Sequence, residues 1–168
     1  QQALYTASRF LNCNVLAIDL SLTSLSYAKR KTQELGIKNI EYMQGDILKL
    51  DQLKREFDII ECTGVLHHMD DPLAGWKVLA ERLRANGIMK IGLYSQIARQ
   101  NIANAREEIV KKGYTSSPDD IRRYREETMS MDTKSDPETS MFTRTNDFST
   151  LSECRDLLFH VQEHRFTL

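Results

Sequence analysis

Cysteine is scarce in this 168-residue sequence, and long apolar runs are absent from it. The three cysteines, Cys13, Cys62 and Cys154, are an odd number at wide spacings and form no C-x-x-C pair. This arrangement argues against a disulfide framework and a zinc knuckle, and it suits a reducing compartment. No apolar run approaches the roughly 20 residues that cross a bilayer. We therefore expect a soluble, cytoplasmic protein with no membrane partner.

An excess of charge of either sign is also missing. Lys and Arg total 23 against 24 Asp and Glu, which leaves a net charge of −1. Because nucleic-acid-binding proteins usually present a basic surface, this balance favours a small-molecule substrate and no nucleic acid. The length fits one domain built around one core.

Short apolar runs alternate with amphipathic segments over the first hundred residues. The runs that predict strands are 15–19, 40–43, 57–62 and 88–93. The segments that predict helices are 1–12, 21–36 and 71–87. The inward positions of the second helix would be Leu22, Leu25, Thr32 and Leu35. This alternation predicts an α/β domain with a parallel sheet.

The pattern changes from Gln96 onward. Residues 97–112 and 118–129 are polar and helical in pattern, and 130–149 is rich in Ser, Thr and Asp with little periodicity. We interpret this part as a helical insertion or lid.

Two acids follow predicted strands, at the edge where a doubly wound sheet binds its ligand. Asp19 ends the first strand, where a carboxylate accepts hydrogen bonds from the two hydroxyls of a ribose. Asp46 follows Gly45 after the second strand, where it would accept from an adenine amino group. Each acid has an alternative interpretation, Asp19 as a cap of the next helix and Asp46 as an ordinary turn residue.

The stretch from Cys62 to His68 follows the third strand. Thr63 and Gly64 allow the backbone to approach a ligand, and His67 and His68 would orient a substrate or take a proton. The alternative is that one histidine packs and the other is solvated. Adjacent histidines point apart on regular structure, so we expect no metal site here.

A second metal pattern lies near the end of the sequence. His160, Glu163 and His164 fit the H-x-x-E-H arrangement of inverted zincins. Zinc needs a further ligand, and the sequence supplies none visibly. We therefore predict no metal.

Taken in order, these features resemble the class I (Rossmann-like) S-adenosylmethionine-dependent methyltransferases over about residues 1–95. The resemblance is carried by Val15–Ser21, Gly45–Ile47, Phe57–Pro72 and Arg84–Ile91. A narrower resemblance, at Asp156–Thr167, is to methyltransferases fused to tetratricopeptide repeats, which would then lie in the same parent chain.

The resemblance implies a Rossmann-like doubly wound, mostly parallel sheet, S-adenosyl-L-methionine as cofactor, and a role for each matching residue. Asp19 would bind the ribose and Leu20 would pack on adenine, while Asp46 and Ile47 would contact the adenine edge. The residues beside the methionine part of the cofactor would be Cys62, Thr63, Gly64 and Val65. His67 would face the acceptor as the catalytic base or orienting group.

The family's first strand and glycine-rich turn would precede Gln1, so we expect an incomplete sheet and a fragment that is inactive alone. Residues 1–95 would form a partial S-adenosylmethionine-binding domain, and 96–168 the helical insertion and the start of a C-terminal part. The leading hypothesis is a methyltransferase with an unidentified acceptor. The alternatives are a non-catalytic methyltransferase-like binding or scaffolding module and, less favoured, a nicotinamide oxidoreductase.

Overall fold

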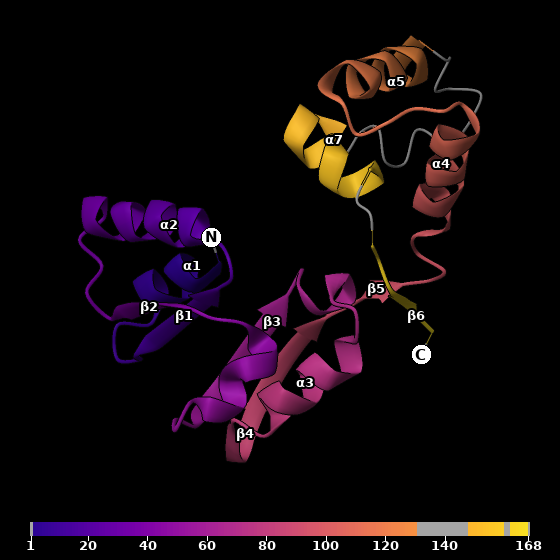
Figure 1. Ribbon diagram of the computed structural model, residues 1–168. Helices are drawn as coiled ribbons and strands as arrows, with labels where there is room; N and C mark the ends of the chain where they lie inside the picture. Colours follow the sequence, from indigo (N-terminus) through magenta and orange to yellow (C-terminus); the bar gives the residue numbers. More distant parts are fainter. Residues whose placement is uncertain (1, 131–147, 160–161, 168) are drawn as a thin grey trace. The chain divides into compact units, whose positions relative to one another are not determined.

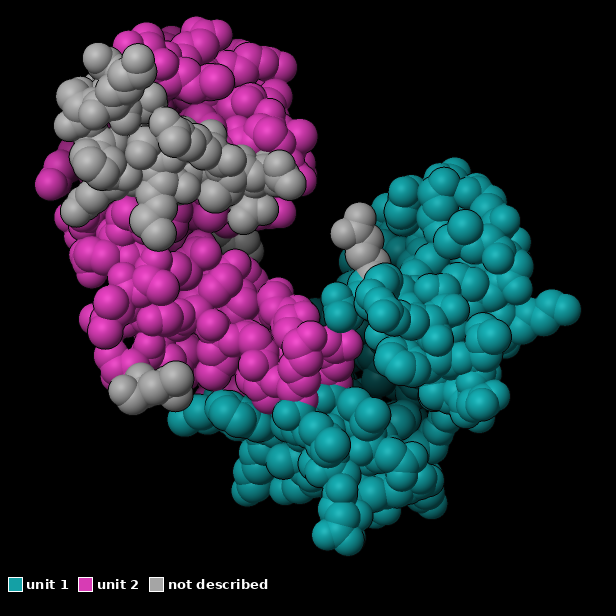
Figure 2. Space-filling model, turned by 180° about the vertical axis from the view of Figure 1, so that it is seen from behind, with its two compact units in different colours: residues 1–60, 73–89 teal, residues 61–72, 90–168 magenta. Residues whose placement is uncertain are grey.

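The computed structural model describes residues 2–130, 148–159 and 162–167 (Figure 1). The chain divides into two compact units (Figure 2). Unit 1 comprises residues 1–60 and 73–89, and unit 2 comprises residues 61–72 and 90–168. No helix among the described residues has both the length and the apolar character needed to cross a membrane.

Unit 1 contains the first parallel strand pair. Strand β1 (Val15–Asp19) runs parallel to β2 (Ile40–Gln44), with Val15 opposite Ile40 and Asp19 opposite Gln44. Helices α1 (Gln2–Arg9) and α2 (Leu22–Glu34) both pack on this pair. A short 3₁₀ helix, η1 (Ile47–Gln52), follows β2. The predicted strands and the predicted second helix are confirmed here.

Local sequence explains where α2 begins and ends. The hydroxyl of Ser21 accepts a hydrogen bond from the Ser24 N–H at 3.2 Å, which caps the first turn. Gly36, at φ +67°, provides the left-handed residue that stops the helix. Of the predicted inward positions, Leu25 and Thr32 are buried, whereas Leu22 and Leu35 are exposed. The prediction was wrong for those two because they lie at the ends of the helix.

Strands β3 (Phe57–Thr63) and β4 (Leu83–Gly92) form a second two-stranded sheet. Between them lie the 3₁₀ helix η2 (Leu66–His68) and helix α3 (Pro72–Ala80). The sequence placed the helix end at 87 and the strand start at 88, and both positions were wrong. Gly87 lies within β4, where an added Cβ would sit 2.9 Å from the Asp58 carbonyl oxygen. Because Gly87 has no side chain, β3 and β4 can approach each other closely at this position. Glycine also commonly ends helices, which is why the sequence pattern predicted a helix end here.

Unit 2 contains a helical cluster and a third strand pair. Helices α4 (Gln100–Lys111) and α5 (Pro118–Ser130) confirm the two predicted helices, and α7 (Leu151–Leu158) packs against both. Their shared core consists of Ile102, Ala105, Ile109, Ile121, Tyr124, Phe148, Cys154, Leu157 and Leu158. Strand β5 (Tyr94–Ser95) runs parallel to β6 (Arg165–Phe166). Most of the predicted aperiodic stretch, 131–147, lies outside the described residues.

The sheet topology refines the predicted fold. The class is α/β with parallel pairing, as predicted, but the described strands form three two-stranded sheets rather than one, in the orders β1–β2, β3–β4 and β5–β6. Among the described residues, β1 and β3 are not hydrogen-bonded to one another.

Candidate functional site

Asp19 lies at the carboxyl end of β1 and is exposed to solvent. Its Oδ1 accepts a hydrogen bond from the Ser21 N–H at 2.8 Å in a turn that precedes α2. The cap of α2 is Ser21, so the alternative interpretation of Asp19 as the helix cap was wrong. Oδ2 of Asp19 has no hydrogen-bond partner among the described residues. The carboxylate is therefore fixed by one oxygen and available through the other. Leu20, the next residue, is 68% exposed.

Asp46 occupies the corresponding place after β2. Its Oδ1 accepts from the Leu48 N–H at 3.0 Å and caps η1. The loops after β1 and β2 are tied together, because the Gln44 side chain donates to the Leu20 carbonyl at 3.0 Å and the Gly45 N–H donates to the Asp19 carbonyl at 3.2 Å. Unit 1 thus brings together two turn-fixed carboxylates at one edge of the parallel pair, and Ile47 beside them is half-buried.

The predicted stretch after β3 lies in unit 2. Cys62 is buried, which raises the pKa of its thiol, while Thr63, Gly64 and Val65 are exposed. Gly64 has φ +75°, a backbone conformation that other residues rarely adopt. Thr63 also lies against Gly92, where an added Cβ would approach Thr63 atoms at 3.0–3.2 Å. Gly64 therefore permits the backbone conformation directly after β3, and Gly92 permits the end of β4 to lie close to Thr63, the last residue of β3.

His67 is almost completely enclosed, with 1% of its surface exposed. Its ring stacks on Tyr94, with centroids 3.6 Å apart and an interplanar angle of 25°. Neither ring nitrogen has a hydrogen-bond partner within the part of the chain that the structure describes. Burial, together with the smaller effect of the neighbouring His68, lowers the pKa of His67 to about 4. His67 is therefore neutral at pH 7.

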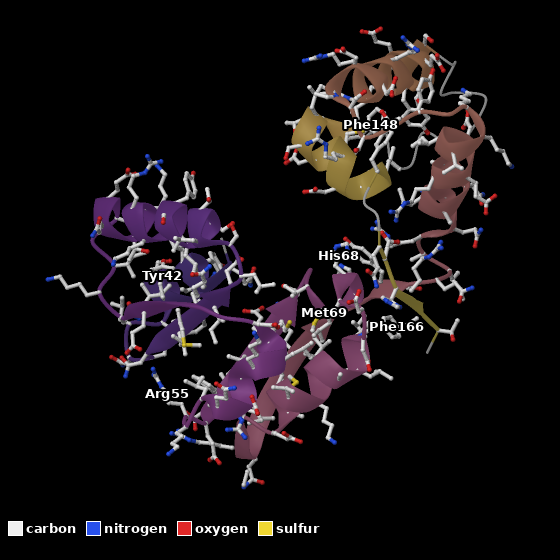
Figure 3. All side chains as sticks on the ribbon, in the orientation of Figure 1. Tyr42, Arg55, His68, Met69, Phe148 and Phe166 are labelled. Carbon is white, nitrogen blue, oxygen red and sulfur yellow. The ribbon has the colours of Figure 1, made fainter. Side chains whose placement is uncertain are left out.

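His68 does not point away from its neighbour, contrary to the expectation for adjacent histidines. The two rings lie 4.3 Å apart, edge to face, because the residues lie in a 3₁₀ turn rather than a strand or α-helix. His68 and Met69 lie beside the segment that leads into β6 (Figure 3). Nδ1 of His68 is 3.0 Å from the Gln162 carbonyl oxygen.

The H-x-x-E-H segment has a different environment from a zinc site. The Glu163 side chain is 3% exposed and accepts hydrogen bonds from Arg99 and Arg106 at 3.0–3.3 Å. His160 lies outside the described residues. In the described part of the chain, no three histidine, cysteine or acidic side chains gather as a metal-binding group. The Glu163 carboxylate of this segment is instead engaged by two guanidinium groups.

The sequence model of a family described as a methyltransferase domain matches residues 2–146. The chain belongs to the methyltransferase domain family. A relative from Synechococcus sp., the uncharacterized protein syc1184_c, is 37% identical over 106 residues, which are 62% of this chain and 25% of that protein. A protein from Papaver bracteatum, named probable (S)-tetrahydroprotoberberine N-methyltransferase 2, is 29% identical over 66 residues, 39% of this chain and 18% of that protein.

Solved structures share the fold of this methyltransferase domain. PKMT2 from Rickettsia typhi aligns with a TM-score of 0.74 at 20% identity, over 97% of this chain and 33% of that one. The same protein has been solved in complex with AdoHcy, with a TM-score of 0.72. The methyltransferase chain thus spans about a quarter of its Synechococcus relative and a third of PKMT2.

The predicted site residues of the methyltransferase domain fall into two groups. Asp19, Leu20, Asp46 and Ile47 belong to unit 1, and Cys62 to Val65 with His67 belong to unit 2. Sequence reasoning missed Tyr94, which stacks on His67, and also Arg99 and Arg106, which both donate to Glu163. Two signals could have found them. Tyr94 directly follows the fourth strand, and the two arginines are seven residues apart, on one helical face.

Two hollows in the methyltransferase domain contain none of the predicted residues. One, of about 520 Å³, lies in unit 1 near the start of β1, between Ser8, Leu35 and Asn39. The other, of about 780 Å³, lies in unit 2 beside α4 and is lined in part by Arg106 and Glu163. None of the predicted site residues therefore lines either hollow.

Proposed function

We propose that the protein carrying this chain transfers a methyl group from S-adenosylmethionine to an acceptor that donates a hydrogen bond. Family membership supports methyl transfer, and the neighbour solved with AdoHcy supports the choice of cofactor. The cofactor supplies a methyl group already activated by its sulfonium. The residues of this chain would then act by binding the cofactor and the acceptor and by orienting them toward each other. Such positioning accounts for much of the catalysis when a nucleophile displaces an already activated methyl group.

The adenosine half of the cofactor fits the edge of β1 and β2. Asp19 would accept hydrogen bonds from the ribose hydroxyls through Oδ2, while its bond to the Ser21 N–H holds the carboxylate in place. Asp46 and Ile47 would contact the adenine edge, and the exposed Leu20 would pack on its ring. The fixed carboxylates are the observation that carries this assignment, since a pre-oriented acceptor loses little entropy on binding.

The acceptor side is assigned to unit 2. Cys62 to Val65 would lie beside the methionine part of the cofactor. Among the described residues neither nitrogen of His67 has a hydrogen-bond partner, and a buried nitrogen without one costs roughly 1–3 kcal/mol. An acceptor N–H or O–H that donated to the unprotonated nitrogen of the neutral ring would remove the cost at that nitrogen and orient the nucleophile. Since the ring is 1% exposed, a neighbouring side chain must move before the acceptor makes this contact.

The proposed function also implies a division of the chain into parts that serve the cofactor and the acceptor. Residues 1–95 would form part of the cofactor-binding domain, and residues 96–168 the helical insertion and the start of a C-terminal part. Residues 97–150 would form part of the acceptor pocket, and the longer parent chain would carry tetratricopeptide repeats. The coverage of the relatives supports a parent longer than these 168 residues. The second candidate, a non-catalytic binding module, would keep the cofactor site and lack methyl transfer.

Calorimetric titration of the intact protein that carries this chain with S-adenosylhomocysteine tests the adenosine site. In Asp19→Asn, the amide oxygen still accepts from the Ser21 N–H, so the turn survives while the charged acceptor for the ribose is lost. We expect affinity to fall roughly tenfold or more, as for a hydrogen bond to a charged group. Asp51→Asn is the matched control, because Asp51 is an exposed acid in η1 of the same unit. Equal affinities for the two variants would refute the assignment, and tighter binding of NADH would favour an oxidoreductase.

A further inference from the structure

The hollow beside α4 in unit 2 has a wall of apolar side chains. Val110 of α4, which is 76% exposed, lines it together with Leu158 and Phe159 at the carboxyl end of α7. Leu158 belongs to the helical core and Phe159 packs against that core, so this wall stands on packed helices. The volume of the hollow, about 780 Å³, lies within the range of sites that bind small molecules, roughly 300–1,000 Å³. A small organic molecule therefore fits it in size.

Positive charge exceeds negative charge at one side of this hollow. The Glu163 carboxylate, 3% exposed, accepts hydrogen bonds from both Arg99 and Arg106. The two guanidinium groups reach the same oxygen, at 3.2 and 3.0 Å, so their donor nitrogens lie no more than about 6 Å apart. Burial lowers the pKa of Arg106, and the positive charges of Arg99 and Arg165 lower it too, against the effect of Glu163. One carboxylate thus serves three neighbouring guanidinium groups, all of which stay protonated.

Two of the cations that line the hollow have no partner in the protein. The charged side chains of the lining are Arg106, Glu107, Lys111, Glu163 and Arg165. Within the described ranges, the side chains of Lys111 and Arg165 form no hydrogen bond and no ion pair. With Arg99, which shares Glu163, four cations are present against two carboxylates. Pairing inside the protein therefore leaves positive charge uncompensated, and guanidinium donors fit the oxygens of a carboxylate or phosphate.

We propose that this hollow binds an amphipathic organic anion, whose carboxylate or phosphate lies against Lys111 and Arg165 and whose apolar body covers Val110 and Phe159. An uncharged ligand would leave the two cations without a counter-charge. An inorganic anion would leave the apolar wall in water. The chemistry of the lining therefore favours a ligand that has both parts. Binding here needs neither the cofactor nor His67, so the inference goes beyond the proposed methyl transfer.

Titration of the intact protein with small probes tests this site. The probes are 4-phenylbutyrate, phenyl phosphate, the uncharged 4-phenylbutyramide and inorganic phosphate. Binding is followed by NMR of labelled valine methyl groups, and the Val110 signal is assigned by its loss in Val110→Ala. Saturating S-adenosylhomocysteine is present throughout, so that a cofactor site is filled. We expect one of the two organic anions to shift the Val110 signal and to bind about tenfold tighter than the amide and inorganic phosphate. The tighter of the two identifies the charged group.

Three substitutions at exposed cations show where the anion binds. Lys111→Gln and Arg165→Gln should each weaken binding of the organic anion about five- to tenfold and leave the amide unchanged. Arg122→Gln is the matched control, because Arg122 is exposed on α5 of the same unit and does not line the hollow.

Several results would overturn the proposal. They are equal binding of amide and organic anions, equally tight binding of inorganic phosphate, no shift of the Val110 signal, and a loss in Arg122→Gln as large as in the other two variants. If Lys111→Gln or Arg165→Gln does not fold, the remaining one decides. A protein that binds the organic anion but no S-adenosylhomocysteine would refute the proposed function and support this site.

Discussion

Acidification destabilises the fold through His67, and the size of the effect follows from its burial. The pKa of the ring is about 4 in the folded chain against 6.5 when unperturbed. Between these values the unfolded chain binds a proton that the folded chain excludes, so stability is lost as the pH falls through this window. The difference corresponds to at most roughly 3 kcal/mol, of which about 2 kcal/mol is lost between about pH 7.5 and pH 5.

Urea unfolding followed by far-ultraviolet circular dichroism measures this loss. The matched variant is His67→Phe, which keeps an aromatic ring against Tyr94 and cannot titrate. Other titrating groups contribute to both proteins, so the difference between their pH dependences isolates His67. We expect the free energy of unfolding of the variant to fall about 2 kcal/mol less over this range. Parallel pH dependences would show that His67 is not buried neutral, and the reasoning about its protonation would fail.

Three further substitutions test the packing around the site. Gly92→Ala places a Cβ 3.0–3.2 Å from atoms of Thr63, so we expect a loss of about 1–3 kcal/mol in unfolding free energy by urea titration. Ile121→Ala empties a fully buried position of the helical core and should cost about 2–5 kcal/mol, whereas Val110→Ala, 76% exposed, should change thermal stability little. Ser21→Ala removes the cap of α2 and should cost about 1 kcal/mol, and a larger loss of helix signal on heating would contradict so local a role.

The strands and the acids that follow them could be predicted from the sequence. An apolar run that ends in an acid, as before Asp19, identifies both a buried strand and its carboxyl end. Because parallel strands place these ends at one edge, Asp19 and Asp46 were expected to lie near one another. The structure agrees, since Asp19 pairs with Gln44, two residues before Asp46. The periodicity of apolar residues and the cap of α2 were enough to predict these elements. The contacts that form them are local, or follow from the pairing of β1 with β2.

The surroundings of His67 could not be predicted from the sequence. Its stack on Tyr94 joins residues 27 positions apart, and the Glu163 pair with Arg99 joins residues 64 positions apart. Contacts between residues so far apart in the sequence leave no periodic pattern of apolar residues from which they could be predicted. The two-residue strands β5 and β6 are also too short to leave an alternating pattern, yet their pairing brings Glu163 toward Arg99. Hydrophobic patterning predicts elements, whereas this cluster depends on tertiary pairing of polar side chains.

The turn that Asp19 forms in the structure and its proposed role as a ligand for ribose are compatible in this geometry. A carboxylate has two oxygens, and the Ser21 N–H engages only Oδ1. That bond limits rotation of the side chain, so Oδ2 is held at the carboxyl edge of β1 at no further entropic cost to binding. The hydrogen bond from the Ser21 N–H would therefore assist the proposed contact between Asp19 and ribose. The same reasoning applies to Asp46, whose Oδ1 is held by the Leu48 N–H. Substitution by asparagine rather than alanine is for this reason the informative change at both positions.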